Sequence, residues 1–409
     1  MSKLTKFFRH PVLYWKDYFR KRSSKVGTST VVNPSAQGVG KVSYTINFSG
    51  VNIFREFSYY LHTGESLEAG ANHLDLWLPL LLGFRIPFLL IVRNEKLYYW
   101  VIREYQNVDV VYAKGAGDVG KVVERFPYIR MALYPSSLGN NIHLVRFEDI
   151  RHCFIGHGDS DKASSAHKAL RMFDEIWVAG QAHIDRFLNK SFNVSGLEFR
   201  KIGRPALKRI IDSGGRVRND KSLGKVLYLP TWEGSNYKND YSSVAISREI
   251  ISFVSELALI NVKFHPFTGH RDAGLKNIRD QATTAFRGNQ QVSVTSISTP
   301  ILDIIENYDI FICDISSVVT ECLALDAPIL LYFPKDKVIE LASSKMSFDD
   351  YCYVFSSVEE LKLQIQEIIS KGDPKADSRK AAVDYFIGLD ETRGLRMKDL
   401  IKSSGSLAV

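Results

Sequence analysis

The stretch Ile310-Phe311-Ile312-Cys313-Asp314-Ile315-Ser316-Ser317 decides the fold class of this protein. Its first four residues form a short apolar run, rich in β-branched and aromatic side chains, which predicts a strand. The strand ends in Asp314, and after the two serines comes Val318-Val319-Thr320-Glu321, which predicts a helix over residues 317–325. A strand that turns directly into a helix is the repeating unit of α/β proteins.

The same alternation continues along the chain from about residue 41. Further strands are predicted at residues 88–92, 108–112, 153–155, 175–178, 226–229, 262–264 and 329–332. Further helices are predicted at residues 51–61, 73–82, 119–126, 162–172, 181–189, 245–257, 300–307, 357–371 and 375–386. This alternation implies parallel sheets joined by right-handed crossovers, whose ligands bind at the carboxyl ends of the strands.

A boundary between two α/β halves is expected near residues 205–224. A polar, glycine-bearing stretch follows Gly203-Arg204-Pro205, and a new apolar strand begins at Lys225. We therefore expect two Rossmann-like domains that face a cleft, where the ligand should bind. The predicted divisions are residues 1–40 as a terminal segment and linker, 41–210 and 220–385 as the two domains, and 386–409 as a tail able to cross back.

The positive charge is concentrated at the N-terminus. The chain of 409 residues carries a net charge of +8, and Met1 to Lys25 alone holds eight bases and one acid. The near-neutral remainder argues against a nucleic-acid-coating protein. Aromatic residues interleave with the bases over residues 3–22, which favours an interfacial segment worth roughly 1 kcal/mol per base at an anionic leaflet. The alternative is a solvated arm that packs on its own domain.

The rest of the composition predicts a protein of the cytoplasm. The most apolar segment, residues 76–92, is interrupted by prolines, a glycine and an arginine and falls short of a membrane span. No secretory signal is recognisable. The four cysteines are too scattered for a disulfide scaffold and show no zinc spacing, so we expect neither metal nor cofactor. They are Cys153, Cys313, Cys322 and Cys352.

The first unusual strand end is Gly156-His157-Gly158-Asp159-Ser160-Asp161-Lys162. The glycines let the backbone approach a ligand, and a histidine at a strand end can take a proton at neutral pH. The alternative is a histidine that caps the following helix. Asp159-Ser160-Asp161 also resembles the Asp-x-Asp metal motif of one class of sugar transferases, but His157 and Lys162 already supply positive charge.

Polar residues also stand at the ends of three more predicted strands. Pro266 forces His265 into an extended conformation that directs its side chain out of the sheet. Thr231 follows another strand and can bond a phosphate or a base, whereas core packing is favoured for the adjacent Trp232. Asp314, Ser316 and Ser317 precede a helix, where free N–H groups and hydroxyls suit a phosphate. Glu321 lies one turn further on and can accept from ribose hydroxyls. Ordinary helix capping is the alternative.

The motifs of several other enzyme classes are incomplete or absent in this sequence. Gly115-Ala116-Gly117-Asp118-Val119-Gly120 matches the glycine pattern of dinucleotide sites, but no acidic residue follows about 20 residues on. The chain has neither a P-loop nor a Gly-x-Ser-x-Gly elbow. These absences argue against nicotinamide-dependent, ATPase and hydrolase functions.

Four of these motifs, in this order, resemble the CDP-glycerol glycerophosphotransferase family of teichoic-acid and capsule synthesis. The similar segments are His157-Gly158 with Lys162, Leu227 to Trp232, Lys263-Phe264-His265-Pro266, and Asp309 to Glu321. The likeness covers roughly residues 150–335, and the residues after His157 depart from the Thr-Pro-Leu-Lys type continuation of the teichoic-acid enzymes. The N-terminal segment resembles the start of Gram-negative capsule and O-antigen transferases.

The resemblance implies a GT-B fold with an acceptor domain at 41–210 and a nucleotide-donor domain at 220–385. It implies a CDP-glycerol or other cytidine-nucleotide donor and a lipid-linked glycan acceptor. The basic aromatic segment adds the expectation of an anionic membrane surface as partner and of a peripheral place on the inner face of the cytoplasmic membrane. An acceptor hydroxyl would attack the β-phosphorus and CMP would leave.

The implied roles fall on the strand-end residues. His157 would be the base or would orient the acceptor, while His265, Ser316 and Ser317 would hold the donor phosphates and Glu321 the ribose. The remaining expected substrate-binding residues are Gly158, Asp159, Lys162, Thr231 and Asp314. The alternatives are a CMP-sugar transferase for Kdo or sialic acid, and a catalytically inactive scaffold anchored at the membrane.

Overall fold

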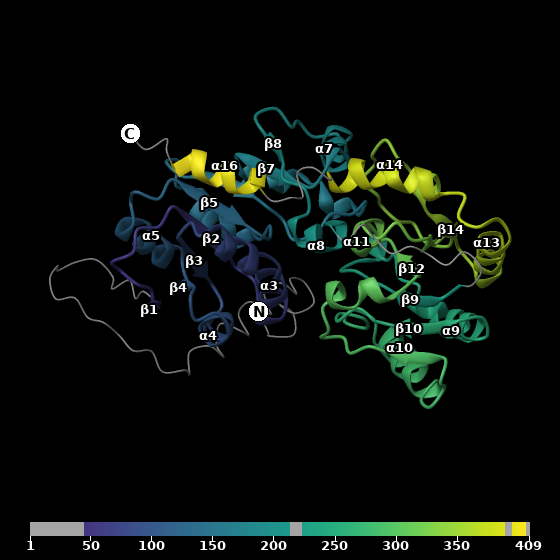
Figure 1. Cartoon of the computed structure of the whole chain (residues 1–409). Coiled ribbons are helices and arrows are strands. Elements are labelled where there is room, and N and C mark those ends of the chain that lie inside the picture. The colour runs from purple at the N-terminus through teal and green to yellow at the C-terminus, as the bar shows by residue number, and fades with distance from the viewer. Residues whose placement is uncertain (1–44, 213–222, 389–394, 406–409) are drawn as a thin grey trace, which may run out of the picture.

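The computed structural model describes residues 45–212, 223–388 and 395–405. In these ranges the chain forms two α/β lobes, each built on its own sheet (Figure 1). The basic aromatic segment predicted over residues 1–40 lies outside the described residues. Within the described ranges, no helix combines the length and the apolar character needed to cross a membrane.

The first sheet, as far as the chain is described, has eight strands in the order β1-β4-β3-β2-β5-β6-β7-β8. Their bounds are Ile46–Gly50 (β1), Tyr59–Thr63 (β2), Phe88–Val92 (β3), Asp109–Ala113 (β4), Met131–Tyr134 (β5), Arg151–Phe154 (β6), Glu175–Val178 (β7) and Glu198–Lys201 (β8). All neighbours run parallel except β1, which pairs antiparallel with β4. The parallel strands follow the Rossmann order, so the winding reverses between β2 and β5.

The second sheet repeats this plan with six parallel strands among the described residues, in the order β11-β10-β9-β12-β13-β14. Their bounds are Lys225–Leu229 (β9), Leu259–Val262 (β10), Val292–Val294 (β11), Ile310–Asp314 (β12), Ile329–Tyr332 (β13) and Tyr353–Phe355 (β14). The winding reverses between β9 and β12. In a sheet of this topology the crevice at the reversal is where ligands bind.

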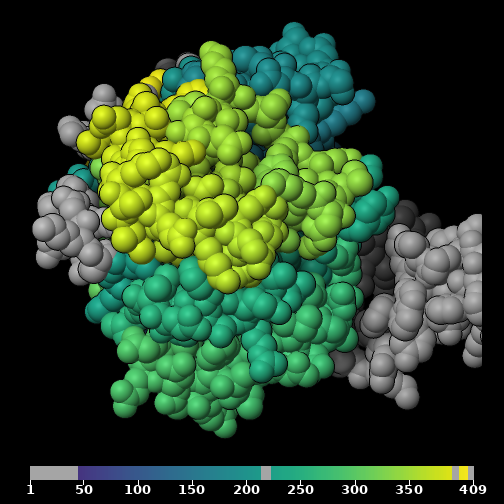
Figure 2. Space-filling view, turned by 90° about the vertical axis from the view of Figure 1, so that its right-hand side faces the viewer, coloured from purple at the N-terminus to yellow at the C-terminus, as the bar shows by residue number. Residues whose placement is uncertain are grey.

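Helices cover both faces of each sheet, because alternate residues of the buried strands enter two separate apolar clusters. In the first lobe they are α3 (Leu67–Phe84), α4 (Glu95–Glu104), α5 (Ala116–Arg125), α6 (Ile142–Val145) and α7 (Gln181–Leu188). The short α8 (Lys208–Asp212) follows them in the chain, and its Ile210 packs in an apolar cluster of the second lobe. In the second lobe they are α9 (Ser247–Ser255), α10 (Ala273–Ala285), α11 (Val318–Leu323), α12 (Phe348–Tyr351), α13 (Val358–Lys371) and α14 (Ala376–Ile387). Figure 2 shows the outer face of this lobe, where the yellow C-terminal helices lie above the green α9 and α10 region.

The predicted α/β fold class is confirmed, and so are most of the predicted elements. The helix predicted over residues 51–61 is wrong, because residues 51–58 form no helix and the last three residues begin the central strand β2. The segments 162–172 and 300–307 contain short 3-10 turns instead of full helices, and the strand predicted at 262–264 ends at Val262. Strands β1, β2, β5, β8, β11 and β14 were not predicted, since none of them is a long β-branched run.

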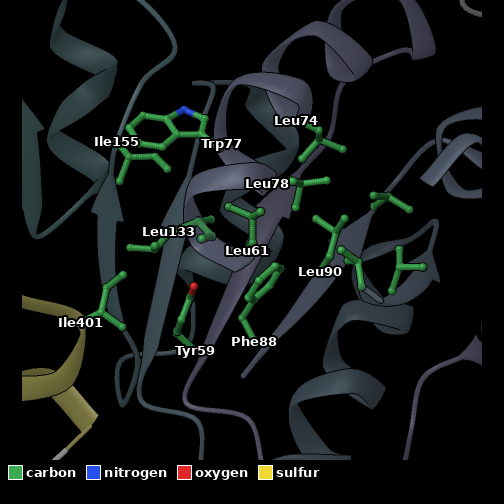
Figure 3. Close-up of a cluster of buried hydrophobic side chains, with 14 of the residues drawn as sticks. Tyr59, Leu61, Leu74, Trp77, Leu78, Phe88, Leu90, Leu133, Ile155 and Ile401 are labelled. Atoms are coloured by element: carbon green, nitrogen blue, oxygen red, sulfur yellow. The ribbon is translucent and has the colours of Figure 1, made fainter. Parts of the chain in front are cut away.

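The C-terminal chain crosses between the lobes. Gly180, just before α7, allows the backbone of α14 to approach, because a Cβ there would lie 2.5 Å from the carbonyl oxygen of Tyr385. The last described helix, α16 (Leu395–Gly405), then lies against the first lobe (Figure 1). Its Met397 is buried in the apolar cluster that surrounds β2. Its Ile401 is buried in the same cluster (Figure 3).

We expect the Ile401→Ala substitution to destabilise the first lobe. Ile401 is 1% exposed, and a truncated buried isoleucine typically costs about 2–5 kcal/mol. Ile369→Ala is the matched control, because Ile369 lies on helix α13 and is 50% exposed. Calorimetry should show a clearly lower melting temperature for Ile401→Ala than for Ile369→Ala. Equal melting temperatures would show that α16 does not pack on the first lobe in solution.

Candidate active site

The winding reversal of the second sheet is held together by one buried carboxylate. Asp314, at the end of β12, accepts hydrogen bonds at Oδ2 from the backbone N–H of Thr231 at 2.7 Å and of Ser243 at 2.9 Å. Burial raises the pKa of Asp314 to about 7, although these bonds act in the opposite direction. The side chain is fully buried, and its two hydrogen bonds hold the loop after β9 in place.

The loop after β6 reaches across from the first lobe to this reversal. A Cβ added at Gly158 would lie 3.0 Å from the Cβ of Ser317, so only a glycine fits there without displacing its neighbour. Lys162 Nζ donates to Thr231 Oγ1 at 3.4 Å, and Thr320 Oγ1 donates to the carbonyl of Asp159 at 3.1 Å. The structure thus brings the predicted residues of the two lobes together.

A buried arginine fixes the shape of this loop. Arg186 on α7 is fully buried, and it pairs with Asp159 through Nη1 and with Asp161 through Nε at 2.7 Å. His183, also on α7, lies 3.5 Å from Asp159. The carboxylates of Asp159-Ser160-Asp161 are therefore directed into the first lobe, and Asp159 is buried instead of facing a substrate. In the described part of the chain, no three His, Cys, Asp or Glu side chains are grouped to hold a metal ion.

His157 lies on this loop with a defined tautomer. Its Nδ1 is 3.0 Å from the carbonyl oxygen of Pro135, which follows β5. Because a carbonyl can only accept, Nδ1 carries the proton and Nε2 keeps its lone pair. Taken as a whole residue, His157 is exposed to solvent. Desolvation and then the neighbouring His73 lower the pKa of His157 to about 4, so the ring is neutral at pH 7.

His265 has the opposite tautomer. Its Nδ1 accepts from the backbone N–H of Phe267 at 3.1 Å, so its proton is on Nε2, which can donate. Desolvation, followed by Lys162 and Lys263, lowers the pKa of His265 to about 3. The half-buried Trp232, for which core packing was favoured, stacks on this ring with centroids 6.1 Å apart.

The loop that carries His265 is anchored by a residue that the sequence did not indicate. The buried carboxylate of Glu233 accepts from the backbone N–H groups of Gly269, Arg271 and Asp272 at 2.7 to 3.0 Å. Three bonds to one carboxylate hold the residues after His265 in a fixed turn.

Cations converge on the same place. Lys162 lies in the contact region between the lobes, where burial lowers its pKa to about 8 while Asp314 acts in the opposite direction. Lys263, which directly follows β10, also has its pKa lowered by burial. Ser317 is half-buried at the start of α11, and Ser316 is buried with its hydroxyl bonded to the carbonyl of Asp314 at 3.3 Å. The arrangement can neutralise an anion.

Glu321 occupies a place between the lobes. Its Oε1 is 3.4 Å from Nη2 of Arg204, which follows β8 of the first lobe. Burial raises the pKa of Glu321, with Arg204 and Lys263 opposing the shift. Arg204 was visible in the sequence only as part of the boundary segment Gly203-Arg204-Pro205. In the structure it neutralises the residue that was expected to hold the ribose.

A second group beside His157 was also missed. His73 on α3 stacks on His157, and Glu65 lies within 2.8 Å of His73. Glu65 follows β2, and the signal that could have found it is the turn Thr63-Gly64-Glu65 after a strand. That strand was predicted as a helix, so its end could not be recognised.

Comparison with known proteins agrees with the motifs. A family model described as CDP-Glycerol:Poly(glycerophosphate) glycerophosphotransferase matches residues 155–394, which is more than half of the chain and includes both histidines. No curated protein matches the sequence.

Solved structures resemble the fold at low sequence identity. The wall teichoic acid polymerase TagF matches with a TM-score of 0.52 and 12% identity over 88% of this chain and 91% of its own. A glycosyltransferase from Rickettsia africae ESF-5 matches with a TM-score of 0.50 and 10% identity over 85% and 99%. UDP-GlcNAc 2-epimerase from Methanocaldococcus jannaschii matches with a TM-score of 0.50 and 12% identity over 85% and 100%. The predicted GT-B architecture is thereby confirmed.

Replacing Arg186 should destabilise the protein strongly. Arg186→Ala leaves two buried carboxylates without their cation, and breaking a buried pair in this way costs about 3–5 kcal/mol. Arg103→Ala is the control, because Arg103 is 72% exposed beside the exposed Glu104 and such pairs are worth at most about 1 kcal/mol. Urea unfolding should separate the two variants clearly. A similar loss for both would contradict the structural role assigned to Asp159 and Asp161.

Proposed function

Because the chain belongs to the CDP-glycerol:poly(glycerophosphate) glycerophosphotransferase family, we propose that it moves glycerol phosphate from CDP-glycerol to a hydroxyl of a glycan acceptor and releases CMP. The observation that carries the proposal is the pair of neutral histidines with opposite tautomers. One offers a lone pair and the other offers a proton. Transfer of a phosphoryl group to a hydroxyl requires both.

The reaction balances without a cofactor. The acceptor oxygen forms a bond to the β-phosphorus, and the bond from that phosphorus to the bridging oxygen breaks. The electron pair leaves with CMP, and the hydroxyl proton passes to a base. The enzyme must therefore accept one proton and stabilise negative charge on the phosphates.

His157 is the proposed base. Its free Nε2 can take the hydroxyl proton, while the bond from Nδ1 to Pro135 keeps the ring oriented. A pKa of about 4 makes it a weak base in the unliganded protein. A bound diphosphate adds negative charge nearby, which raises the pKa of a histidine and brings it closer to the working pH.

The donor phosphates are proposed to lie between His265, Lys263, Lys162 and Ser317. The Nε2–H of His265 and the hydroxyl of Ser317 can donate to phosphate oxygens, and the two lysines supply charge. Asp314 and Ser316 then act by holding the surrounding loops, since their polar groups bond to the backbone. Thr231 contacts Lys162 and positions it.

Glu321 is proposed to hold the ribose only after it exchanges partners. In the structure it is paired with Arg204 at 3.4 Å and is largely buried. A ribose bound to Glu321 must displace Arg204 from it. Donor binding would thus be coupled to a change in the contact between the lobes.

The proposed acceptor is carried on a lipid, and the basic aromatic segment at residues 3–22 is proposed to hold the protein at the inner face of the cytoplasmic membrane. Its support is the local excess of bases interleaved with aromatic residues. A lipid-linked acceptor and a membrane-bound transferase would meet in two dimensions, which raises their effective concentration.

Substitution of the two histidines is expected to affect turnover and donor binding differently. His157→Asn keeps a donor near the Nδ1 position but has no base, so turnover should fall by about 10²–10⁴ while CDP-glycerol still binds. His265→Ala should lose both turnover and donor affinity. Calorimetric binding of CDP-glycerol and release of CMP measure the two effects. Full activity in either variant would refute the assignment.

The identity of the donor is checked in the same assay. The product of the wild-type protein should show a phosphodiester signal by phosphorus NMR. Turnover of CMP-Kdo or CMP-sialic acid, with CDP-glycerol untouched, would establish the CMP-sugar transferase instead. The absence of any thermal shift with all cytidine nucleotides would favour a scaffold without activity.

Removal of residues 1–25 tests the membrane assignment. The truncated protein should no longer sediment with liposomes that contain anionic lipid, because it loses most of the net positive charge. Its activity on a water-soluble acceptor should stay unchanged. Liposome binding equal to that of the full chain would contradict the proposal.

A further inference from the structure

Two titratable residues of the first lobe lie behind His157 and outside the matched family range. Glu65 follows β2, and its side chain is 7% exposed. Thr63 Oγ1 donates to Glu65 Oε2 at 3.2 Å, and the N–H of Glu65 donates back to Thr63 Oγ1 at 3.3 Å. The carboxylate is therefore fixed at the winding reversal of the first sheet, beside the end of β5.

His73 links this carboxylate to the proposed base. It lies on α3, two turns after Glu65, with its Nδ1 2.8 Å from Glu65 Oε2. A carboxylate can only accept, so Nδ1 of His73 carries a proton. The rings of His73 and His157 stack with centroids 3.6 Å apart and planes inclined by 14°. The three side chains form one continuous arrangement, Glu65 to His73 to His157.

We propose that Glu65 and His73 are positioning residues that orient His157 and set its affinity for the acceptor proton. The inference rests on the proposed function, in which His157 is the base. The His157 ring is held at its edge by Pro135 and on one face by His73, so its Nε2 has a single direction. Glu65 in turn fixes the ring of His73.

Glu65 and His73 also act on His157 electrostatically, and their effects on its pKa have opposite signs. Although burial alone acts to raise it, the bond to His73 keeps the pKa of Glu65 below its usual value, so Glu65 is ionised at neutral pH. Its negative charge raises the pKa of His157, whereas His73 lowers it. Arg204 is the further charged group that faces His157, and it also lowers the pKa. Glu65 therefore favours the imidazolium that forms during transfer, and His73 opposes it.

Because Glu65 and His73 act on the pKa of His157 in opposite directions, their variants should shift it in opposite directions, which a general loss of structure would not do. Glu65→Gln removes the negative charge, so the pKa of His157 should fall and the acid limb of the kcat/KM profile should move to lower pH. His73→Phe keeps a stacked ring but removes the opposing group and releases Glu65, so the limb should move to higher pH. Each variant should lose about tenfold in kcat, less than the loss of the base itself.

The pKa of His157 is measured independently of turnover by nitrogen NMR of labelled histidine. Asp109→Asn is the matched control, because Asp109 is a buried, ion-paired acid of the same sheet and bonds Arg55 at 2.6 Å instead of a histidine. The control should leave the titration of His157 unchanged. Opposite shifts in Glu65→Gln and His73→Phe support the proposal, and shifts of the same sign or no shift overturn it.

The outcome also separates this inference from the proposed function. If His157→Asn is inactive while neither Glu65→Gln nor His73→Phe moves the titration, His157 remains the base and the positioning roles are wrong. If His157→Asn is fully active, the proposed function of His157 fails first, and the NMR titration still decides whether Glu65 and His73 control its protonation.

Discussion

The ion pairs of the buried Arg186 are the interaction on which the rest of the site depends. One guanidinium holds Asp159 and Asp161, and this fixes the loop that begins at His157 and ends at Lys162. Because the loop is rigid, Gly158 can touch Ser317 and Lys162 can reach Thr231 in the other lobe. Burial of three charged groups is costly unless they neutralise one another, so the geometry of the loop and the stability of the first lobe are coupled.

Each sheet places its reversal of winding at this contact. Asp314 ties β9 to β12 in the second sheet, while Pro135 after β5 orients His157 in the first. The two histidines are neutral at pH 7, so their tautomers are selected by the backbone groups that they face. At pH 7 the first lobe therefore presents a proton acceptor, Nε2 of His157, and the second lobe presents a proton donor, the Nε2–H of His265.

The sequence indicated candidate site residues where they follow a recognisable strand. His157, His265, Thr231 and Ser317 all follow apolar runs, and the structure places Gly158 and Lys162, on the loop of His157, against Ser317 and Thr231. Asp159 was expected to bind substrate, but its partner Arg186 is one of two charged residues on α7, and nothing in the sequence marks it as buried. Glu65 was missed because residues 51–61 were predicted as a helix, and only the fold shows that a strand ends at Thr63.

The central claim is that the donor lies between the two histidines. A crystal structure of the His157→Asn variant with CDP-glycerol tests it most directly. The account predicts a β-phosphate within hydrogen-bonding distance of Nε2 of His265 and the hydroxyl of Ser317, with its phosphorus facing residue 157. A diphosphate bound away from His265, or a phosphorus that residue 157 cannot approach, would contradict it.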